Sequence, residues 1–237
     1  TEWGSTSVDD RLVGGPGNDS YYYDDIFGGV VTIIDDTSTG DTNILYVQDH
    51  PTHFGEKHTV SLALEGAALT LVFTPESGRP EVPWTEPVHK ILIPNFNPND
   101  AFTPTAINQI VINAGRQDEV AFTYQQLVEG GITINGTGPN KLVTGTNADD
   151  RITALPGDTL SGGIGNDAYF FNRGGGTETI TDTAVPDAMN AVTFGPGIEP
   201  GDLTLVEEPN ALTIQVGTSG DQLTLAQFDL SGLNGSQ

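Results

Sequence analysis

Hydrophobic and polar residues alternate along two stretches of the chain, 58–74 and 201–217. Apolar side chains at every second position are typical of β-strands with one buried face. The alternation breaks around Glu65 and Gly66 in the first stretch and around residues 208–210 in the second, so each stretch predicts a β-hairpin. No stretch has the spacing of a long amphipathic helix, and only 124–128 is expected to form a helical turn, with Thr123 as N-cap. The pattern therefore predicts an all-β fold.

A second pattern, with a period of about nine residues, runs through 145–182. The segment GGIGNDAYF shows it most fully, with its glycines at Gly162, Gly163 and Gly165. An aspartate, Asp167, follows the glycines, and a large apolar residue, Tyr169, comes two positions later. Glycines allow the positive φ values of a tight turn, and the apolar residue is expected to point inward. Stacked turns would bring the remaining carboxylates beside backbone carbonyls, and such hard oxygen ligands suit calcium.

The tandem pattern resembles the RTX (haemolysin-type) nonapeptide repeat. GTNADDRIT (145–153) fits it with two glycines replaced, ALPGDTLS (154–161) is one residue short, and 174–180 fits it loosely, with Glu178 in place of the aspartate. The resemblance implies a parallel β-roll that binds calcium. It also implies type I secretion and folding outside the cell. The alternative is that each Gly-Asn-Asp segment is an ordinary turn capped by its own side chains.

The N-terminal part of the chain repeats this theme. GGPGNDSYYYD (14–24) matches GGIGNDAYFFN (162–172), and later stretches of the two halves also correspond. We therefore expect a tandem duplication, with one copy in 1–134 and the other in 135–237. The second copy resembles the domain related to haemolysin-type calcium-binding proteins, most recognisably in FGPGIEPGDLTL (194–205). The expected fold is all-β, with short parallel β-roll segments continued by β-hairpins and present twice.

The candidate calcium ligands of the second copy follow from a roll with two strands per coil, in which successive turns alternate between two sides. A calcium ion would lie between one turn and the next turn on the same side. This pairs Asp150 with Asp167 on one side. On the other side it pairs Asp158 with Glu178, and a further site would pair Asp167 with the amide of Asn190. Backbone carbonyls would complete about six to eight ligands; the candidates for the first pair lie near Gly145, Asn147, Asp149, Gly163 and Gly165.

The first copy offers fewer carboxylates. Asp10 is expected to face a turn that carries Val30 and Val31, and Asp19 is expected to face Asn43. Gly15 and Gly17 are further candidate ligand positions in the turn of Asp19. A calcium ion there would have one charged ligand instead of two, so we expect weaker binding or none.

The net charge of the chain limits which classes of molecule it is expected to bind. Its 237 residues include 32 acidic and 8 basic ones, for a net charge of −24. This argues against nucleic acid and anionic membranes as partners. No apolar run approaches the roughly 18 residues of a membrane span. Cysteine is absent, so there is no disulfide framework or thiolate metal site. Thr1 opens no signal peptide, which suggests a fragment or export without an N-terminal signal.

Two other kinds of chemistry remain open. Residues 49–58 contain three histidines, His50, His53 and His58, together with two acids, a set that would suit a transition metal. Pro51 excludes a helix that would align the imidazoles, and a solvated loop is the simpler interpretation. Trp3, Trp84 and the tyrosines 21–23 would suit a sugar platform, although alternation puts Tyr21 and Tyr23 on a core-facing side. No Gly-x-Ser-x-Gly or P-loop motif is present.

The first hypothesis is therefore a calcium-binding, extracellular structural module of a larger RTX-type secreted bacterial protein, without catalysis of its own. An adhesin or carbohydrate-binding segment, with a glycan or another cell-surface ligand as partner, is one alternative. A metal-dependent enzyme that uses the histidine loop is the other.

Overall fold

The computed structural model describes residues 2–4, 10–24, 30–35, 40–48, 58–75, 89–182 and 188–228. The chain forms two compact units, one within residues 1–97 and 101–130 and the other within 98–100 and 131–237. We call them the first and second units. The chain passes from one to the other at Gly130–Gly131, whereas the boundary expected after residue 134 lies inside a strand of the second unit.

Both units are built almost entirely of β-strands, as the alternation predicts. The strands of the first unit are β1 (Glu2–Gly4), β2 (Asp10–Val13), β3 (Ser20–Asp24), β4 (Val30–Ile34), β5 (Ile44–Gln48), β6 (His58–Glu65), β7 (Ala68–Pro75), β8 (His89–Ile93), β9 (Gln109–Ile112) and β10 (Val120–Thr123). Those of the second are β11 (Ile132–Asn135), β12 (Leu142–Thr144), β13 (Asp150–Thr153), β14 (Thr159–Ser161), β15 (Ala168–Phe171), β16 (Thr177–Ile180), β17 (Ala191–Phe194), β18 (Leu203–Glu208), β19 (Ala211–Val216) and β20 (Asp221–Ala226).

Helical structure in the described residues is short. Two 3-10 helices cover Pro98–Asp100 (η2) and Pro200–Asp202 (η3). The α-helix α1 (Tyr124–Glu129) begins after Thr123, whose hydroxyl accepts a 3.2 Å hydrogen bond from the Gln126 backbone. The Gln126 side chain in turn accepts from the Thr123 N–H at 2.9 Å, which completes a capping box. The expected N-cap is thus confirmed. No described helix is long and apolar enough to cross a membrane.

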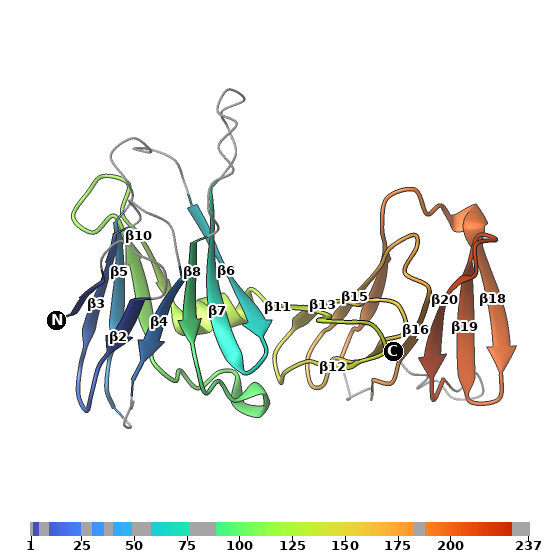
Figure 1. Ribbon diagram of the computed structural model, residues 1–237, viewed down its shortest axis with the longest axis horizontal. Helices are drawn as coiled ribbons and strands as arrows, with labels where there is room; N and C mark the ends of the chain where they lie inside the picture. The colour runs from blue at the N-terminus through green and yellow to red at the C-terminus, as the bar shows by residue number, and fades with distance from the viewer. Residues whose placement is uncertain are drawn as a thin grey trace. The chain divides into compact units, whose positions relative to one another are not determined.

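In each unit the chain alternates between two sheets, which makes the parallel roll. In the second unit β11, β13, β15 and β17 neighbour one another in one sheet, and β12, β14 and β16 in the other. In the first unit β1, β3 and β5 alternate in the same way with β2 and β4. All these neighbours pair in parallel. Figure 1 shows the short strands and connecting turns of each roll.

The core of the roll consists of the apolar residues that the repeat places two positions after each acid. Ile152, Leu160, Tyr169 and Ile180 are all at most 6% exposed, as expected. The tyrosines of the first unit behave in the same way, since Tyr21 and Tyr23 are buried. Side chains alternate across a strand, so the acid two positions before each inward residue faces the same way, and the acids Asp150, Asp158, Asp167 and Glu178 are only 1–2% exposed.

Each roll continues into an antiparallel hairpin. β6 pairs with β7 across the turn at residues 66–67, and β18 pairs with β19 across Pro209–Asn210. Both hairpins form where the alternation predicts them, but β18 has no buried residue and Leu205 is 65% exposed, so the expected buried face is absent from that strand. The third strand of each antiparallel segment, β8 or β20, then pairs in parallel with a roll strand, β4 or β16. The antiparallel strands β18, β19 and β20 stand side by side in Figure 1.

Candidate metal centre

Asp150 and Asp167 lie in consecutive turns on one side of the second roll. Each comes at the start of its strand, β13 or β15, and the register Arg151↔Ala168 sets the two acids directly side by side. The backbone N–H of Asp150 donates a 2.9 Å hydrogen bond to Oδ1 of Asp167. Both side chains are only 1% exposed. The structure therefore brings together the first pair of acids that the repeat spacing selects.

Backbone carbonyls fill the space between these two turns. A Cβ atom on Gly163, at φ +106°, would collide with the carbonyl oxygen of Thr146, and one on Gly165 would collide with that of Ala148. A Cβ on Gly145 would meet the carbonyl of Gly162 and, at 2.5 Å, Oδ2 of Asp150. Only glycine fits where a carbonyl of the opposite turn approaches so closely. The turns thus stack backbone on backbone, with carbonyl and carboxylate oxygens between them.

The carbonyls in this space are direct neighbours of the positions expected near Gly145, Asn147, Asp149, Gly163 and Gly165. The ones directed at the opposite turn belong to Thr146, Ala148 and Gly162. The Asp149 carbonyl accepts the Ile132 N–H at 2.9 Å, and its carboxylate accepts the Asn166 N–H at 2.8 Å. Asn147 donates its backbone N–H to the Pro98 carbonyl at 2.8 Å. The nonapeptide motif marks these turns but does not tell which carbonyls face each other.

The charges of the first pair are poorly compensated. Burial raises the pKa of Asp150 to about 7; the Thr146 N–H opposes this shift and the charge of Asp167 adds to it. Burial likewise raises the pKa of Asp167 to about 6, opposed by the Asp150 N–H and reinforced by the charges of Asp182 and Asp149. Oδ2 of Asp167 is buried and finds no hydrogen-bond partner among the described residues. Such a pair needs a proton or a cation to become neutral.

Asp158 and Glu178 form the expected pair on the other side of the roll. They precede the register partners Thr159 and Thr179. Both oxygens of Asp158 accept backbone N–H groups, from Lys141 and Leu155, each at 2.8 Å. Glu178 is 2% exposed, and its buried Oε2 meets no donor in the part of the chain that the structure describes. Burial, and then the charges of Asp158 and Asp221, raise the pKa of Glu178 to about 7.

The first unit pairs its acids with uncharged residues, as the sequence predicts. Asp10 is in register with Val31. Asp19 is aligned with Asn43, whose Oδ1 accepts the Asp19 N–H at 2.9 Å. Gly15 donates its N–H to Oδ2 of Asp19 at 3.2 Å, and Gly17 donates its N–H to Asp41 at 3.2 Å. Asp19 and Asp167 therefore each have an asparagine amide on one side, Asn43 or Asn190, and Asp167 also has the carboxylate of Asp150 on the other.

Sequence reasoning missed two acids that follow a roll strand, Asp35 after β4 and the buried Asp182 after β16. Tyr21 and Asn43 both donate to Oδ2 of Asp35. Tyr169 and Asn190 both donate to Oδ2 of Asp182, at 2.7 and 2.6 Å. The nonapeptide pattern has a glycine at this position, so it gives no reason to look for an acid there. The available signal was the internal comparison, because IID (33–35) and ITD (180–182) occupy the same place in the two halves.

The structure adds little about the histidine loop and the aromatic residues, the other candidate sites. His50 and His53 lie outside the described residues, as does Trp84; His58 begins β6, but its side chain is not among those described. Among the described side chains, no three Asp, Glu or His gather as a metal-binding group. Any cation at the acid pairs would therefore depend on carbonyl oxygens as well.

The outward tyrosines of the first roll stack on each other. The rings of Tyr22 and Tyr46 have centroids 4.9 Å apart and an interplanar angle of 13°. This arrangement turns one face of each ring towards the other ring. A sugar platform presents its ring faces to the ligand, so the stacked pair favours a structural ladder along the roll.

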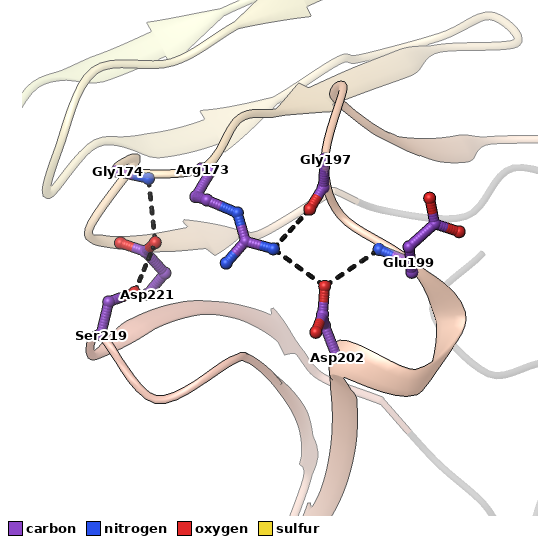
Figure 2. A network of polar contacts seen from close by, with 7 residues as sticks. All are labelled: Arg173, Gly174, Gly197, Glu199, Asp202, Ser219 and Asp221. Atoms are coloured by element: carbon purple, nitrogen blue, oxygen red, sulfur yellow. Dashed lines mark hydrogen bonds and ion pairs between the residues drawn. The ribbon is translucent and has the colours of Figure 1, made fainter.

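A second polar network links the turn between β15 and β16 to the segments that precede β18 and β20 (Figure 2). Arg173 donates to the Gly197 carbonyl and, at 2.8 Å, to Asp202, whose carboxylate also accepts the Glu199 N–H. The Glu199 N–H, and then Arg173, lower the pKa of Asp202. Asp221 accepts the N–H groups of residues 174 and 176, and the first of these is the main cause of its lowered pKa. The network supplies its own donors and so needs no metal ion.

No protein-family model matches the chain, and no curated protein matches it in sequence. Among solved structures, the chain is similar to the extracellular lipase LipA from Serratia marcescens, with 13% sequence identity and a TM-score of 0.27. The comparison covers 98% of this chain and 38% of the lipase, so the chain corresponds to well under half of that protein. A likeness at this level assigns no activity to the chain.

Proposed function

We propose that this chain is a calcium-binding structural module of a larger, secreted RTX-type protein. The observation that carries the proposal is the buried pair Asp150 and Asp167, whose turns stack with carbonyl oxygens between them. Calcium prefers carboxylate and carbonyl oxygens and tolerates irregular arrangements of about six to eight ligands. Magnesium demands near-octahedral geometry and retains its water, so a flexible backbone cradle favours calcium.

The residues present fit such an ion. At the first site, Asp150 and Asp167 would supply the carboxylates, and Thr146, Ala148 and Gly162 would supply carbonyls. At the second site, Glu178 would bring the carboxylate with an unused oxygen, while Asp158 already accepts two backbone N–H groups. The first site therefore has the stronger set of ligands.

Calcium would act on folding. Without it, buried carboxylates of like charge face one another in a chain of net charge −24. An ion that binds only the folded state stabilises it by RT ln(1 + [L]/Kd), about 2.7 kcal/mol at a hundredfold excess over Kd. Two sites would contribute an amount close to the lower end of a whole domain's stability. The folded state of the second roll would thus be only weakly stable at low calcium concentration and well stabilised at high calcium concentration.

This behaviour suits a protein exported by type I secretion that folds outside the cell. We assign no catalytic step to the chain, and the activity of the larger protein would belong to other segments. The stacked tyrosines do not favour the alternative of a glycan-binding module.

The test is a calorimetric titration of the calcium-free chain with calcium, with and without millimolar magnesium. We expect saturable binding that magnesium does not displace. Asp150→Asn should remove one site. Asp118→Asn, which removes the same charge from a loop of the first unit and keeps an oxygen to accept from Asn113, should bind as the wild type does. Absence of binding in the wild type, or equal binding by both variants, would refute the proposal.

A further inference from the structure

The same hydrogen-bonded network occurs once in each unit, beside the turns. In the first unit, the Tyr21 hydroxyl and the Asn43 amide donate to Asp35, the amide at 2.8 Å. Asn43 also accepts the Asp19 N–H through its Oδ1. In the second unit, Tyr169, Asn190 and Asp182 make the equivalent bonds at 2.7 and 2.6 Å, and Asn190 accepts the Asp167 N–H at 2.9 Å.

The register of the roll explains why the network forms. Leu12 pairs with Ile33, and Leu160 pairs with Ile180, so the acids two residues further on lie level with Gly14 and Gly162. A Cβ on Gly14 would meet the hydroxyl of Tyr21 and, at 2.6 Å, Oδ2 of Asp35. A Cβ on Gly162 would overlap Oδ2 of Asp167, and the Gly162 N–H donates to the Tyr169 hydroxyl at 2.8 Å. A glycine in one turn therefore makes room for the polar groups of its neighbours.

The network gives Asp35 and Asp182 side-chain donors, which Oδ2 of Asp167 and Oε2 of Glu178 lack among the described residues. Asp35 receives a phenolic O–H and an amide N–H on one oxygen. Asp182 receives the same two donors and also the Gly163 N–H, at 3.2 Å. Such donors stabilise a buried carboxylate in its charged form. The asparagine amide is essential to the network, because an aspartate at Asn43 or Asn190 would accept hydrogen bonds but could not donate one to the neighbouring acid.

We propose that this Tyr–Asp–Asn network is a metal-independent lock that closes the turn stack in each unit. The proposal rests on the calcium function of the second roll and adds its regulation. The first roll, where Asp10 faces Val31 and Asp19 faces Asn43, is held by its lock and stays folded without calcium. The second roll carries the lock together with the acid pairs and tightens only when calcium binds. The chain therefore joins a permanently folded roll to a calcium-dependent one.

The experiment is hydrogen exchange of the full chain, in calcium and in chelator, with peptides that cover 14–23 and 41–48. In the wild type we expect the same protection of these peptides in both conditions. Tyr21→Phe, which deletes one oxygen, should speed their exchange about tenfold in both conditions, as loss of a buried hydrogen bond to a charged group predicts. Protection that falls on chelation in the wild type would overturn the lock.

A paired substitution separates the lock from general stability. Asn43→Ala removes the amide without adding charge, and should speed exchange equally with and without calcium. Asn43→Asp replaces the donor by a carboxylate beside Asp19 and Asp35, and should make protection of the first roll depend on calcium, with one more ion bound per chain. If exchange in Asn43→Asp is as independent of calcium as in Asn43→Ala, then the amide does not take the place that a cation would have between the acids. The lock is then overturned.

The two proposals fail separately. Unchanged protection of residues 145–182 on chelation would count against the calcium function. The lock would then be judged by Tyr21→Phe and by wild-type protection of the first roll, which do not depend on calcium.

Discussion

Asp167 and Asp19 hold the same place in the two rolls but differ in their second carboxylate oxygen. Oδ2 of Asp19 accepts the Gly15 N–H at 3.2 Å. In the second roll the Gly163 N–H, which corresponds to Gly15, goes to Asp182, and Oδ2 of Asp167 is left buried without a described partner. The same acid is therefore internally satisfied in one roll and available to a cation in the other.

The first prediction concerns these two acids. Asp167→Asn keeps the oxygen that accepts from Asp150 but removes the charge. Without calcium the variant should be at least as stable as the wild type, because it relieves the repulsion between carboxylates. With calcium at a hundredfold excess over Kd it should lose about 2.7 kcal/mol of stabilisation. Asp19→Asn is the matched control and should change the calcium response little. Urea unfolding of both variants in the two conditions checks this, and a uniform loss in Asp167→Asn would contradict it.

The second prediction concerns pH. Burial raises the pKa of Asp150, Asp167 and Glu178 to about 7, 6 and 7, from 3.8, 3.8 and 4.5. A carboxyl with a raised folded-state pKa stabilises the folded state most below its unfolded pKa, and this contribution is lost as pH rises through the folded pKa. In calcium-free buffer the second unit should therefore become less stable from pH 5 to pH 8.

Calcium binds the ionised carboxylates and displaces their protons, so the loss of stability from pH 5 to pH 8 should become much smaller when calcium is present, because the unfolded carboxyls are already ionised across this range. Urea unfolding at both pH values, in buffer freed of calcium by ion exchange and in the same buffer with calcium added, measures the two slopes. Equal slopes in the two buffers would show that these acids do not bind the ion.

The third prediction concerns the glycines between the stacked turns. Gly163→Ala would force a side chain into φ +106° and against the Thr146 carbonyl, at a cost on the order of 1–3 kcal/mol for the backbone alone. It should also weaken calcium binding, because the turns would have to separate. Gly15→Ala is the control from the first roll, where an added Cβ would meet no described atom within 4 Å. Equal effects of the two substitutions on unfolding and on calcium affinity would argue against the stacked geometry.

The fourth prediction concerns the network of Figure 2. Arg173 and Asp202 are substantially exposed, so their ion pair contributes little and is screened by salt. Arg173→Ala should lower the unfolding midpoint slightly, by the same amount with and without calcium, and less at 1 M salt. Arg11→Ala, an exposed arginine in β2, serves as the control. A loss seen only in calcium-free buffer would mean that calcium at the Glu178 site replaces the stabilisation that this network provides.

Much of the roll follows from spacing alone. The interval between acids predicts that Asp150 meets Asp167 and that Asp19 meets Asn43, because a parallel coil of fixed length returns equivalent positions to the same side. The hairpins follow equally from alternation about Glu65 and Pro209. These features depend on local periodicity, which the sequence states directly.

The remaining features of the site depend on which groups face each other in neighbouring coils. The spacing of residues along the sequence does not show these contacts. Asp182 is invisible to the nonapeptide pattern, since only its alignment with Gly162 across a strand pair gives it room. The carbonyls of Thr146 and Ala148 likewise become candidates only through the stacking of turns. Asp221 gains its role because β20 returns in parallel beside β16, a pairing between distant segments that alternation cannot predict.

The central claim is that calcium orders the turns of the second roll. Hydrogen exchange of residues 145–182 in calcium and in chelator tests it most directly, with the hairpins 58–74 and 201–217 as internal references. We predict that chelation speeds exchange in 145–182 by about a hundredfold, which corresponds to the roughly 2.7 kcal/mol expected from one site, while both hairpins change much less. Equal protection of 145–182 in the two conditions would mean that these turns are held by glycine and hydrogen bonds alone, and the claim would be wrong.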